Sequence, residues 1–320
     1  MRYATIQHQG SSHFALSKDG AKWFLWQDYA KQFATDKVVS QTQNFLDFVK
    51  RSDALVDHLK KNEASLAKLS TFSVKDTDFL LPFIPVTFRD FYCFEEHVMA
   101  ARKGRGLEMI PEWYQAPIFY YSNHLSFRGP NEVVAYPKDS TQMDCELELA
   151  CVIGKEIRNA TLEQARAAIF GYSILNDWTA RDFQAFEMKI NMGPTKGKDF
   201  CTTFGSQIVS ADELGAAKAK GFDKEIELTI NGEVFTKKNW SGIQFSFEEM
   251  IVRASKNCTI YPGEVFGSGT MGGGCLLEHN LGKDTKRWLK IGDTVGMKWL
   301  PSHSTSTSEP FVLNKIGEPV

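Results

Sequence analysis

Residues 143–153 alternate between apolar and acidic side chains, and this run constrains the fold more than any other part of the chain. Apolar residues recur at every second position from Met143 to Ile153, whereas Glu146 and Glu148 fall on the opposite side. A period of two is typical of a β-strand with one face in a core. The two carboxylates therefore point the same way, roughly 6–7 Å apart because of the rise of a strand.

The spacing of the two glutamates has an ordinary interpretation, because such a pair usually marks a solvated strand face. Glu225 and Glu227 have the same spacing beside an Asn231-Gly232 hairpin turn, and we expect them on the surface. Glu146 and Glu148 repel each other unless water or a hard cation lies between them. The rest of the chain has to distinguish these interpretations.

The composition is that of a globular protein. The chain has 320 residues, of which 42% are hydrophobic and 24% charged, with a formal net charge of −2. We expect no nucleic-acid partner, because a basic excess is missing. We also expect no membrane partner and a cytoplasmic location, since neither a signal-peptide core nor an apolar run of membrane length is visible. Six cysteines without a C-x-x-C pair are typical of a reducing compartment and argue against a zinc site.

The chain is expected to divide into a small N-terminal α/β domain, residues 1–82, and a larger domain, residues 83–320. Apolar residues recur at three- and four-residue steps over 44–68, which predicts helix. Two prolines within residues 80–85 forbid a continued helix and place the boundary there.

Strands dominate the predicted structure beyond the boundary. Strands are expected at 118–121, 132–136, 143–153, 172–176, 225–230, 233–235, 265–267, 288–291 and 294–299. Capping boxes predict two short helices, one starting at Thr161 with Gln164 and one at Ser246 with Glu249. The polar tract 302–308 is expected to form a surface loop. The predicted fold class is α+β, mostly β, with a mixed β-sandwich or roll.

Four further segments carry residues suited to chemistry. They are residues 90–97, with Asp90 and His97; 176–184, with Asp177; 193–202, with Lys198; and the glycine-rich 267–278. Each also has an ordinary interpretation. Asp90 could cap a helix, Asp177 could form a turn at a strand end, and the glycines could form a loop that binds nothing.

Together, these segments resemble the fumarylacetoacetate hydrolase family over about residues 85–300. The matching residues are Asp90-Phe-Tyr92 with His97, Glu146-Leu-Glu148, Asn176-Asp-Trp-Thr-Ala-Arg-Asp182 with Gln184, Lys198 with Thr202, and Ser268-Gly-Thr270 with Leu277-Glu278. The resemblance implies a catalytic β roll and a homodimer. It does not extend to the N-terminal domain.

The resemblance also implies a metal site. Its acidic ligands would be Asp90, Glu146, Glu148 and Asp177, with Lys198 and Thr202 close to the metal. Carboxylate ligands without histidine or cysteine suit a hard cation, which we expect to be Mg²⁺ or else Ca²⁺ or Mn²⁺.

The implied activity is hydrolysis of a C–C bond in a small β-diketo acid, fumarylacetoacetate- or acylpyruvate-like. His97 would be the general base, Glu278 would orient it, and Lys198 would stabilise developing charge or help protonate the carbanion. The candidate substrate contacts are Tyr92, Arg105, Gln184 and Thr270.

The chain departs from the family pattern at two positions, which bear on the alternatives. Met188 stands where the hydrolase has a substrate-binding tyrosine, which argues against fumarylacetoacetate itself. Ala100 stands where smaller members carry a glutamate three residues after the histidine, so Glu278 is the better partner for His97. The alternatives are a 2-oxo acid decarboxylase or isomerase, of the oxaloacetate or hydroxymuconate type, and a binding module with a structural cation.

Overall fold

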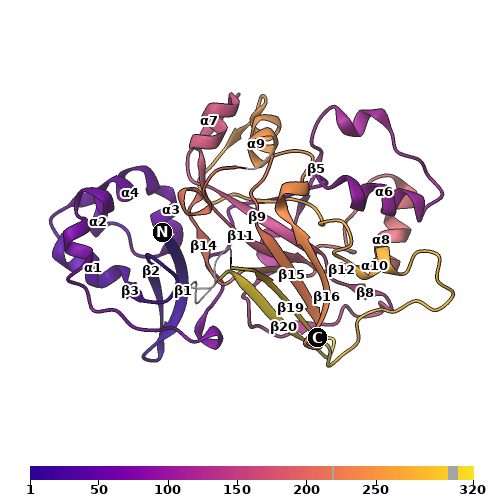
Figure 1. Ribbon diagram of the computed structural model, residues 1–320, viewed down its shortest axis with the longest axis horizontal. Coiled ribbons are helices and arrows are strands. Elements are labelled where there is room, and N and C mark those ends of the chain that lie inside the picture. The colour runs from indigo at the N-terminus through magenta and orange to yellow at the C-terminus, as the bar shows by residue number, and fades with distance from the viewer. Residues whose placement is uncertain (218–219, 302–308) are drawn as a thin grey trace.

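The structure is a computed structural model that describes residues 1–217, 220–301 and 309–320. Two mixed β-sheets form its centre, while short helices lie at both ends and along one side (Figure 1). The mostly-β α+β fold predicted from the sequence is confirmed. The tract 302–308, predicted to be a surface loop, lies outside the described residues.

The larger sheet has eleven strands, with the path β3-β2-β1-β14-β11-β9-β18-β4-β5 and with β13 and β6 attached beside β11. Its strands are β1 (Arg2–His8), β2 (Ser11–Ser17), β3 (Trp23–Leu25), β4 (Phe88–Phe91), β5 (Phe119–Ser122), β6 (Phe127–Arg128), β9 (Leu147–Ile153), β11 (Ile169–Asp177), β13 (Thr202–Phe204), β14 (Ile208–Val209) and β18 (Val265–Gly267).

The second sheet has five strands in the order β16-β15-β19-β20-β7. They are β7 (Val134–Ala135), β15 (Glu225–Ile230), β16 (Glu233–Asn239), β19 (Thr294–Trp299) and β20 (Phe311–Gly317). Two short ladders complete the β structure: β8 (Met143–Asp144) with β12 (Thr179–Ala180), and β10 (Ile157–Arg158) with β17 (Thr259–Ile260).

The helices are short and lie outside the sheets. The α-helices are α1 (Trp26–Gln32), α2 (Lys37–Ser40), α3 (Phe45–Lys50), α4 (Ser52–Lys61), α5 (Glu63–Leu66), α6 (Glu95–Lys103), α7 (Leu162–Ala167), α8 (Arg181–Glu187), α9 (Phe247–Ser255) and α10 (Leu276–His279). Short 3₁₀ turns are η1 (Asp76–Asp78), η2 (Pro111–Tyr114), η3 (His124–Ser126), η4 (Met188–Ile190), η5 (Ala211–Leu214) and η6 (Trp240–Gly242). None of the helices in the described ranges is long and apolar enough to cross a membrane.

The helical prediction for residues 44–68 is confirmed, but the segment forms three helices rather than one. The Asn44 side chain accepts a hydrogen bond of 2.9 Å from the Asp47 amide and starts α3. Arg51 and Asn62 then leave helical geometry and separate α3, α4 and α5. Both predicted capping boxes are present, at Thr161 and at Ser246.

The N-terminal strands join the large sheet directly. Strand β1 pairs antiparallel with β14, with Arg2 opposite Val209 and Tyr3 opposite Ile208. One apolar core also combines residues from both sides of position 82, for example Phe45 with Val152. We retain residues 1–82 and 83–320 as a proposed division of the chain. Backbone hydrogen bonds and a shared core connect the two units.

Strand β9 runs through the middle of the large sheet, and both of its faces are covered. Leu147, Leu149 and Cys151 pack in the core between the two sheets, as the alternation predicts. Ala150 and Val152 pack in the other core. The opposite face is therefore buried rather than solvated, and the solvated-face interpretation of the two glutamates is wrong.

Two other expectations also need correction. Residues 288–291 do not form a strand, because only Leu289 makes an isolated bridge, to Met143. The hairpin of β15 and β16 is present. Of the two glutamates expected on its surface, Glu225 and Glu227, only Glu225 is exposed. Glu227 is covered by two lysines, with ion pairs of 3.2 Å to Lys237 and 3.0 Å to Lys298.

Candidate active site

Four neighbouring strands, in the order β11-β9-β18-β4, bring three carboxylates together. Strand β18 lies between β4 and β9, so Gly267 is opposite both Asp90 and Ala150. Strand β11 pairs with the other edge of β9 and ends at Asp177. One oxygen each of Asp90, Glu148 and Asp177 therefore lies within 4.8 Å of the others, although the residues are far apart in the chain.

The space among these carboxylates depends on Gly267. A Cβ atom at this position would lie 2.5 Å from Asp90 Oδ1 and 3.0 Å from Glu148 Oε2. Any side chain would thus crowd the acidic oxygens, so glycine in β18 keeps the space among them free.

The acidic cluster, Asp90, Glu148 and Asp177, is buried, and two of its carboxylate oxygens lack polar partners. The side chains of Glu148 and Asp177 are 0% exposed and that of Asp90 is 2% exposed. Among the described residues, Asp90 Oδ1 and Glu148 Oε1 have no hydrogen-bond partner. Buried, unpaired carboxylate oxygens are costly, and a hard divalent cation would satisfy them. The residues present therefore fit such an ion.

The raised pKa values of the acidic cluster indicate that its carboxylates ionise with difficulty unless a positive charge lies beside them. Burial and the nearby charge of Asp177 raise the pKa of Asp90 to about 7. Burial and the charge of Asp90 raise the pKa of Glu148 well above its ordinary value. The pKa of Asp177 is also raised, by burial and against the opposing effect of Lys198. Each of the three carboxylates thus disfavours ionisation of the other two.

Asp177 is the best-supported member of the cluster. It accepts hydrogen bonds of 2.7 Å from Lys198 Nζ, 2.9 Å from the Tyr120 hydroxyl and 3.2 Å from the Thr202 hydroxyl. Glu148 accepts a single bond of 3.2 Å from the Gly269 amide. These donors hold the two carboxylates in place, occupy both oxygens of Asp177 and leave Glu148 Oε1 without a partner among the described residues.

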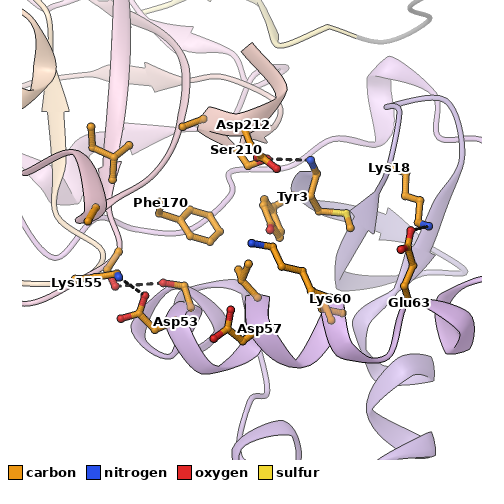
Figure 2. Close-up of a pocket in the computed structure, with 18 of the residues that line it drawn as sticks. Tyr3, Lys18, Asp53, Asp57, Lys60, Glu63, Lys155, Phe170, Ser210 and Asp212 are labelled. Atoms are coloured by element: carbon orange, nitrogen blue, oxygen red, sulfur yellow. Dashed lines mark hydrogen bonds and ion pairs between the residues drawn. The ribbon is translucent and has the colours of Figure 1, made fainter. Parts of the chain in front are cut away.

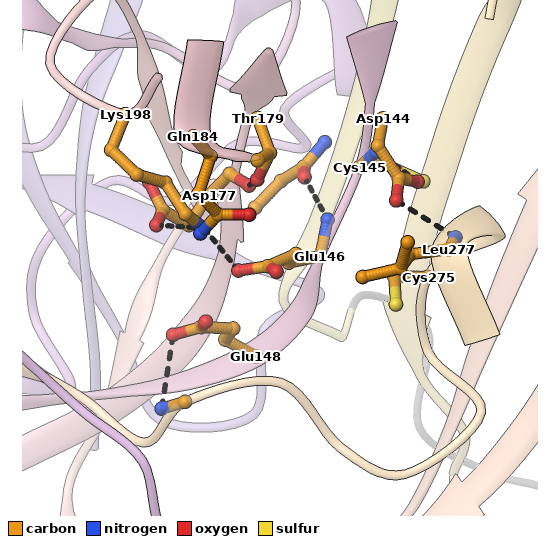
Figure 3. A network of polar contacts seen from close by, with 12 residues as sticks. Asp144, Cys145, Glu146, Glu148, Asp177, Thr179, Gln184, Lys198, Cys275 and Leu277 are labelled. Carbon is orange, nitrogen blue, oxygen red and sulfur yellow. Dashed lines mark hydrogen bonds and ion pairs between the residues drawn. The ribbon is translucent and has the colours of Figure 1, made fainter. Parts of the chain in front are cut away.

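Glu146 lies beside the cluster, but both of its oxygens are engaged by cations. Lys198 Nζ bonds to Oε2 (Figure 3). Arg181 Nη2 lies 2.8 Å from Oε1. Burial alone would raise the pKa of Glu146, but the charges of Lys198 and Arg181 outweigh it and hold the pKa below its ordinary value. Glu146 is therefore a carboxylate at the edge of the cluster, linked to it through Lys198.

Asp144 and Arg181 form a second buried ion pair that braces the site, with a distance of 2.8 Å. Asp144 also accepts bonds of 2.8 Å from the Leu276 amide and 3.0 Å from the Leu277 amide, and so connects β8 to α10 (Figure 3). Sequence reasoning assigned no role to either residue. Asp144 and Arg181 are brought together because Thr179 of β12 pairs with Asp144 of β8, and this pairing is a long-range contact.

His97 and Glu278 form a hydrogen-bonded pair. His97 Nδ1 lies 2.7 Å from Glu278 Oε1, and the Gly273 amide donates to Glu278 Oε2 at 2.7 Å. Burial alone would raise the pKa of Glu278, but the bond to His97 lowers it. A positive charge on His97 also lowers the pKa of Glu146, which connects this pair electrostatically with the carboxylate at the edge of the acidic cluster.

The candidate substrate contacts occupy different environments. The Tyr92 ring packs edge-on against His97, with centroids 5.5 Å apart, and Thr270 is buried in the glycine-rich segment. Gln184 accepts a bond of 3.0 Å from Arg181. Arg105 is exposed beyond the end of α6 and donates to the Ala101 carbonyl at 3.2 Å.

Sequence reasoning also overlooked Tyr120 and Cys275. The Tyr120 hydroxyl contacts Asp177, and Cys275 Sγ lies 3.4 Å from Glu278 Oε1. A signal for Cys275 existed, since it lies three residues before Glu278 in a segment already singled out. Asp90 does not cap a helix, because it lies within β4 and Phe94 precedes α6.

The described chain also has a cavity of about 950 Å³ away from these residues, between α4 and the start of β11 (Figure 2). Its charged walls are partly neutralised by ion pairs of 2.7 Å, Lys155 with Asp53 and Lys18 with Glu63. None of the predicted catalytic or metal-binding residues lines it. We therefore place the candidate active site at the acidic cluster rather than at this cavity.

Comparisons with known proteins agree with the resemblance. A sequence model described as "Fumarylacetoacetate (FAA) hydrolase C-terminal" matches residues 86–306. The chain is 28% identical to the fumarylacetoacetase of Oryza sativa subsp. japonica over 296 residues, covering 74% of this chain and 68% of that protein. It is 34% identical to the mitochondrial oxaloacetate tautomerase of Xenopus laevis over 182 residues, covering 56% of this chain and 53% of that protein.

A solved structure matches the fold over nearly its whole length. The fumarylacetoacetate hydrolase from psychrophilic Exiguobacterium antarcticum superimposes with a TM-score of 0.71 and covers 99% of each chain. The sequence identity is 22%, so this similarity concerns the fold alone.

Proposed function

The chain belongs to the fumarylacetoacetate hydrolase family, and from that premise we propose that it hydrolyses a C–C bond in a small β-diketo acid, with a divalent cation as cofactor. The observation that carries the proposal is the pair of His97 and Glu278, which lie 2.7 Å apart, with His97 acting electrostatically on Glu146 beside the buried acidic cluster. A site that only held a structural cation would have no need of this base.

The acidic cluster would hold the cation through Asp90, Glu148 and Asp177. Glu146 is a candidate fourth ligand, with Lys198 and Thr202 adjacent. Enzymes of this family generally depend on a divalent metal. When bound, Mg²⁺, Ca²⁺ or Mn²⁺ would polarise the substrate carbonyl and stabilise an enolate product.

His97 acts as the general base. Because Nδ1 faces Glu278, the second ring nitrogen is available to take a proton from water. Glu278 holds the ring and stabilises its protonated form. The hydroxide adds to the carbonyl carbon, the adjacent C–C bond breaks with its electron pair on the leaving carbon, and a proton returns to that carbon.

Lys198 remains charged throughout. Burial alone would lower its pKa, but Asp177 and Glu146 raise it above the ordinary value. We propose that its ammonium stabilises negative charge on the leaving fragment rather than accepting a proton. Tyr92, Gln184, Thr270 and Arg105 are the proposed substrate contacts, of which Arg105 is exposed beyond the end of α6 and bonded to the Ala101 carbonyl.

The general base is tested by replacing His97 with alanine and assaying acylpyruvate hydrolysis with Mg²⁺ or Mn²⁺. The expected loss in kcat is about 10²- to 10⁴-fold, the usual contribution of a positioned acid–base group. His13→Ala changes a half-exposed histidine of β2 and serves as the matched control. Undiminished turnover by the His97 variant would refute the proposed base.

The relative from Xenopus laevis, named as an oxaloacetate tautomerase, supports a second candidate on the same site. A 2-oxo acid decarboxylase would release CO₂, and an isomerase or tautomerase would shift an absorbance band without changing mass. Hydrolysis instead produces two acids. Product analysis by mass spectrometry with acetylpyruvate and oxaloacetate separates these reactions.

We further propose that the protein is a cytoplasmic homodimer. All six cysteines are free thiols in the structure, which supports a reducing compartment. Light scattering coupled to size-exclusion chromatography tests the dimer, and a monomeric mass at micromolar concentration would contradict it.

A further inference from the structure

The thiol of Cys275 completes a second cluster of metal-ligating atoms next to the acidic cluster. Cys275 Sγ lies 3.9 Å from His97 Nδ1 and 3.4 Å from Glu278 Oε1, while His97 Nδ1 and Glu278 Oε1 are 2.7 Å apart. Cys275 is 0% exposed and His97 is 4% exposed, so little water competes for these atoms. The mechanism proposed above uses His97 and Glu278 and leaves Cys275 without a role.

From these distances, we propose that His97, Cys275 and Glu278 form a site for a thiophilic divalent cation such as Zn²⁺, and that its occupation inhibits the enzyme. This site is distinct from the all-oxygen acidic cluster. Its ligand set of one nitrogen, one sulfur and one oxygen suits Zn²⁺, whereas Mg²⁺ and Ca²⁺ prefer oxygen alone.

The geometry requires only small adjustments. A tetrahedral ion with bonds of about 2.0–2.3 Å separates its ligand atoms by roughly 3.4–3.6 Å. The two distances from Cys275 Sγ, 3.9 Å and 3.4 Å, are already within a few tenths of an ångström of these values. The separation between His97 Nδ1 and Glu278 Oε1, 2.7 Å, has to open by roughly 0.7 Å, which a side-chain rotation can supply.

The surroundings also support the site. The Gly273 amide donates to Glu278 Oε2 at 2.7 Å and so orients the carboxylate from outside, as partners of metal ligands commonly do. Charge balances as well, because a dication bound to a thiolate, a carboxylate and a neutral imidazole is neutral overall. The thiol proton of Cys275 is released when the ion binds.

The spacing of cysteines in the sequence argues against zinc, and this remains valid for structural sites with paired ligands. The site proposed here has three protein ligands and leaves a fourth position open. Its ligands come from α6 and the start of α10, which only the fold brings together.

Inhibition follows from the identity of the ligands. An ion between His97 Nδ1 and Glu278 Oε1 replaces the hydrogen bond that orients the general base. This consequence depends on the proposed function, whereas binding of the ion does not.

The test uses Co²⁺, which reports a bound thiolate by a near-ultraviolet charge-transfer band that oxygen ligands do not produce. Mg²⁺-loaded wild-type protein titrated with Co²⁺ is expected to show this band. Cys275→Ser should abolish it, and Glu278→Gln, which keeps the thiol, should weaken Co²⁺ affinity by more than about tenfold. Cys258→Ser is the matched control, since Cys258 is the exposed cysteine among the six.

Zn²⁺ inhibition is measured in parallel, as the ratio of turnover with and without Zn²⁺ for each variant at saturating Mg²⁺. Cys275→Ser should raise the inhibitory Zn²⁺ concentration by more than about tenfold, whereas Cys258→Ser should not change it. Absence of the band in the wild type, or its persistence in both Cys275→Ser and Cys275→Ala, would overturn the site. A band without inhibition would retain the site and refute His97 as the base.

Discussion

Replacing Glu148 with glutamine should stabilise the metal-free protein and remove most of the stabilisation that Mg²⁺ provides. Glutamine keeps an oxygen to accept the 3.2 Å bond from the Gly269 amide, so the local hydrogen bonding is retained. The substitution removes one negative charge from the acidic cluster, where Asp90 Oδ1 and Glu148 Oε1 have no partners among the described residues.

The magnitude follows from the geometry of the cluster. At an effective dielectric constant of about 20, two unit charges at the 4.8 Å limit of the cluster repel each other by about 3.5 kcal/mol. In chelator at pH 8, Glu148→Gln should therefore raise the free energy of unfolding by about 3 kcal/mol. With Mg²⁺ at about 100 times its wild-type Kd, the wild type gains about 2.7 kcal/mol, and the variant gains much less.

Urea denaturation in chelator and in Mg²⁺ measures both effects. The expected pattern is that the variant is the more stable protein in chelator and loses most of the Mg²⁺-dependent gain. Glu225→Gln is the matched control, because Glu225 has the same strand spacing but is exposed, and it should respond to neither condition. A Glu148→Gln variant that is less stable in chelator and gains as much from Mg²⁺ as the wild type would refute the reasoning.

Two further predictions concern the same cluster. The pKa of Asp90 is raised from 3.8 to about 7, so Mg²⁺ affinity measured by calorimetry should fall about tenfold per pH unit below 7. The unfolding free energy of the metal-free protein should decrease as pH rises from about 4 to about 7, because over that range the folded carboxyl keeps the proton that the unfolded one has lost. The affinity is measured at pH 5.5 and 8, about 1.5 units below and 1 unit above that pKa. A Mg²⁺ affinity that is the same at both pH values would contradict this prediction. Gly267→Ala places a Cβ 2.5 Å from Asp90 Oδ1 and should abolish Mg²⁺ binding at a cost of about 1–3 kcal/mol in stability. Gly242→Ala, where nothing lies within 4 Å of the added atom, is its control in the same calorimetric and denaturation assays, and equal behaviour of the two variants would argue against the crowding.

The sequence could predict which way side chains point, because strand alternation is a local property. The apolar side of β9 was predicted correctly from the pattern in residues 143–153. The burial of Glu148 on the other face could not be predicted from it, because that face is covered by residues distant in the chain, which form the core around Ala150 and Val152. The same limit explains Glu227, which is covered by lysines of two neighbouring strands.

The candidate site was predictable where its residues belong to short motifs with a fixed spacing in the sequence. It was less predictable where the pairing of distant strands or helices determines which side chains meet. Glu278 was preferred as the partner of His97 because Ala100 offers no carboxylate, and the structure places the two 2.7 Å apart. The engagement of Glu146 by Arg181 was missed, because it requires β8 to pair with β12. The position of Cys275 beside His97 similarly depends on how α10 packs against α6.

The most direct test of the account is a crystal structure of the protein soaked in Mn²⁺, with anomalous differences measured at the manganese edge. The account predicts a strong peak within about 2.0–2.6 Å of oxygens of Asp90, Glu148 and Asp177, the range of bonds from hard cations to oxygen. A well-diffracting crystal in which these carboxylates carry no peak, or in which Mn²⁺ binds only at surface acids such as Glu225, would contradict the central claim.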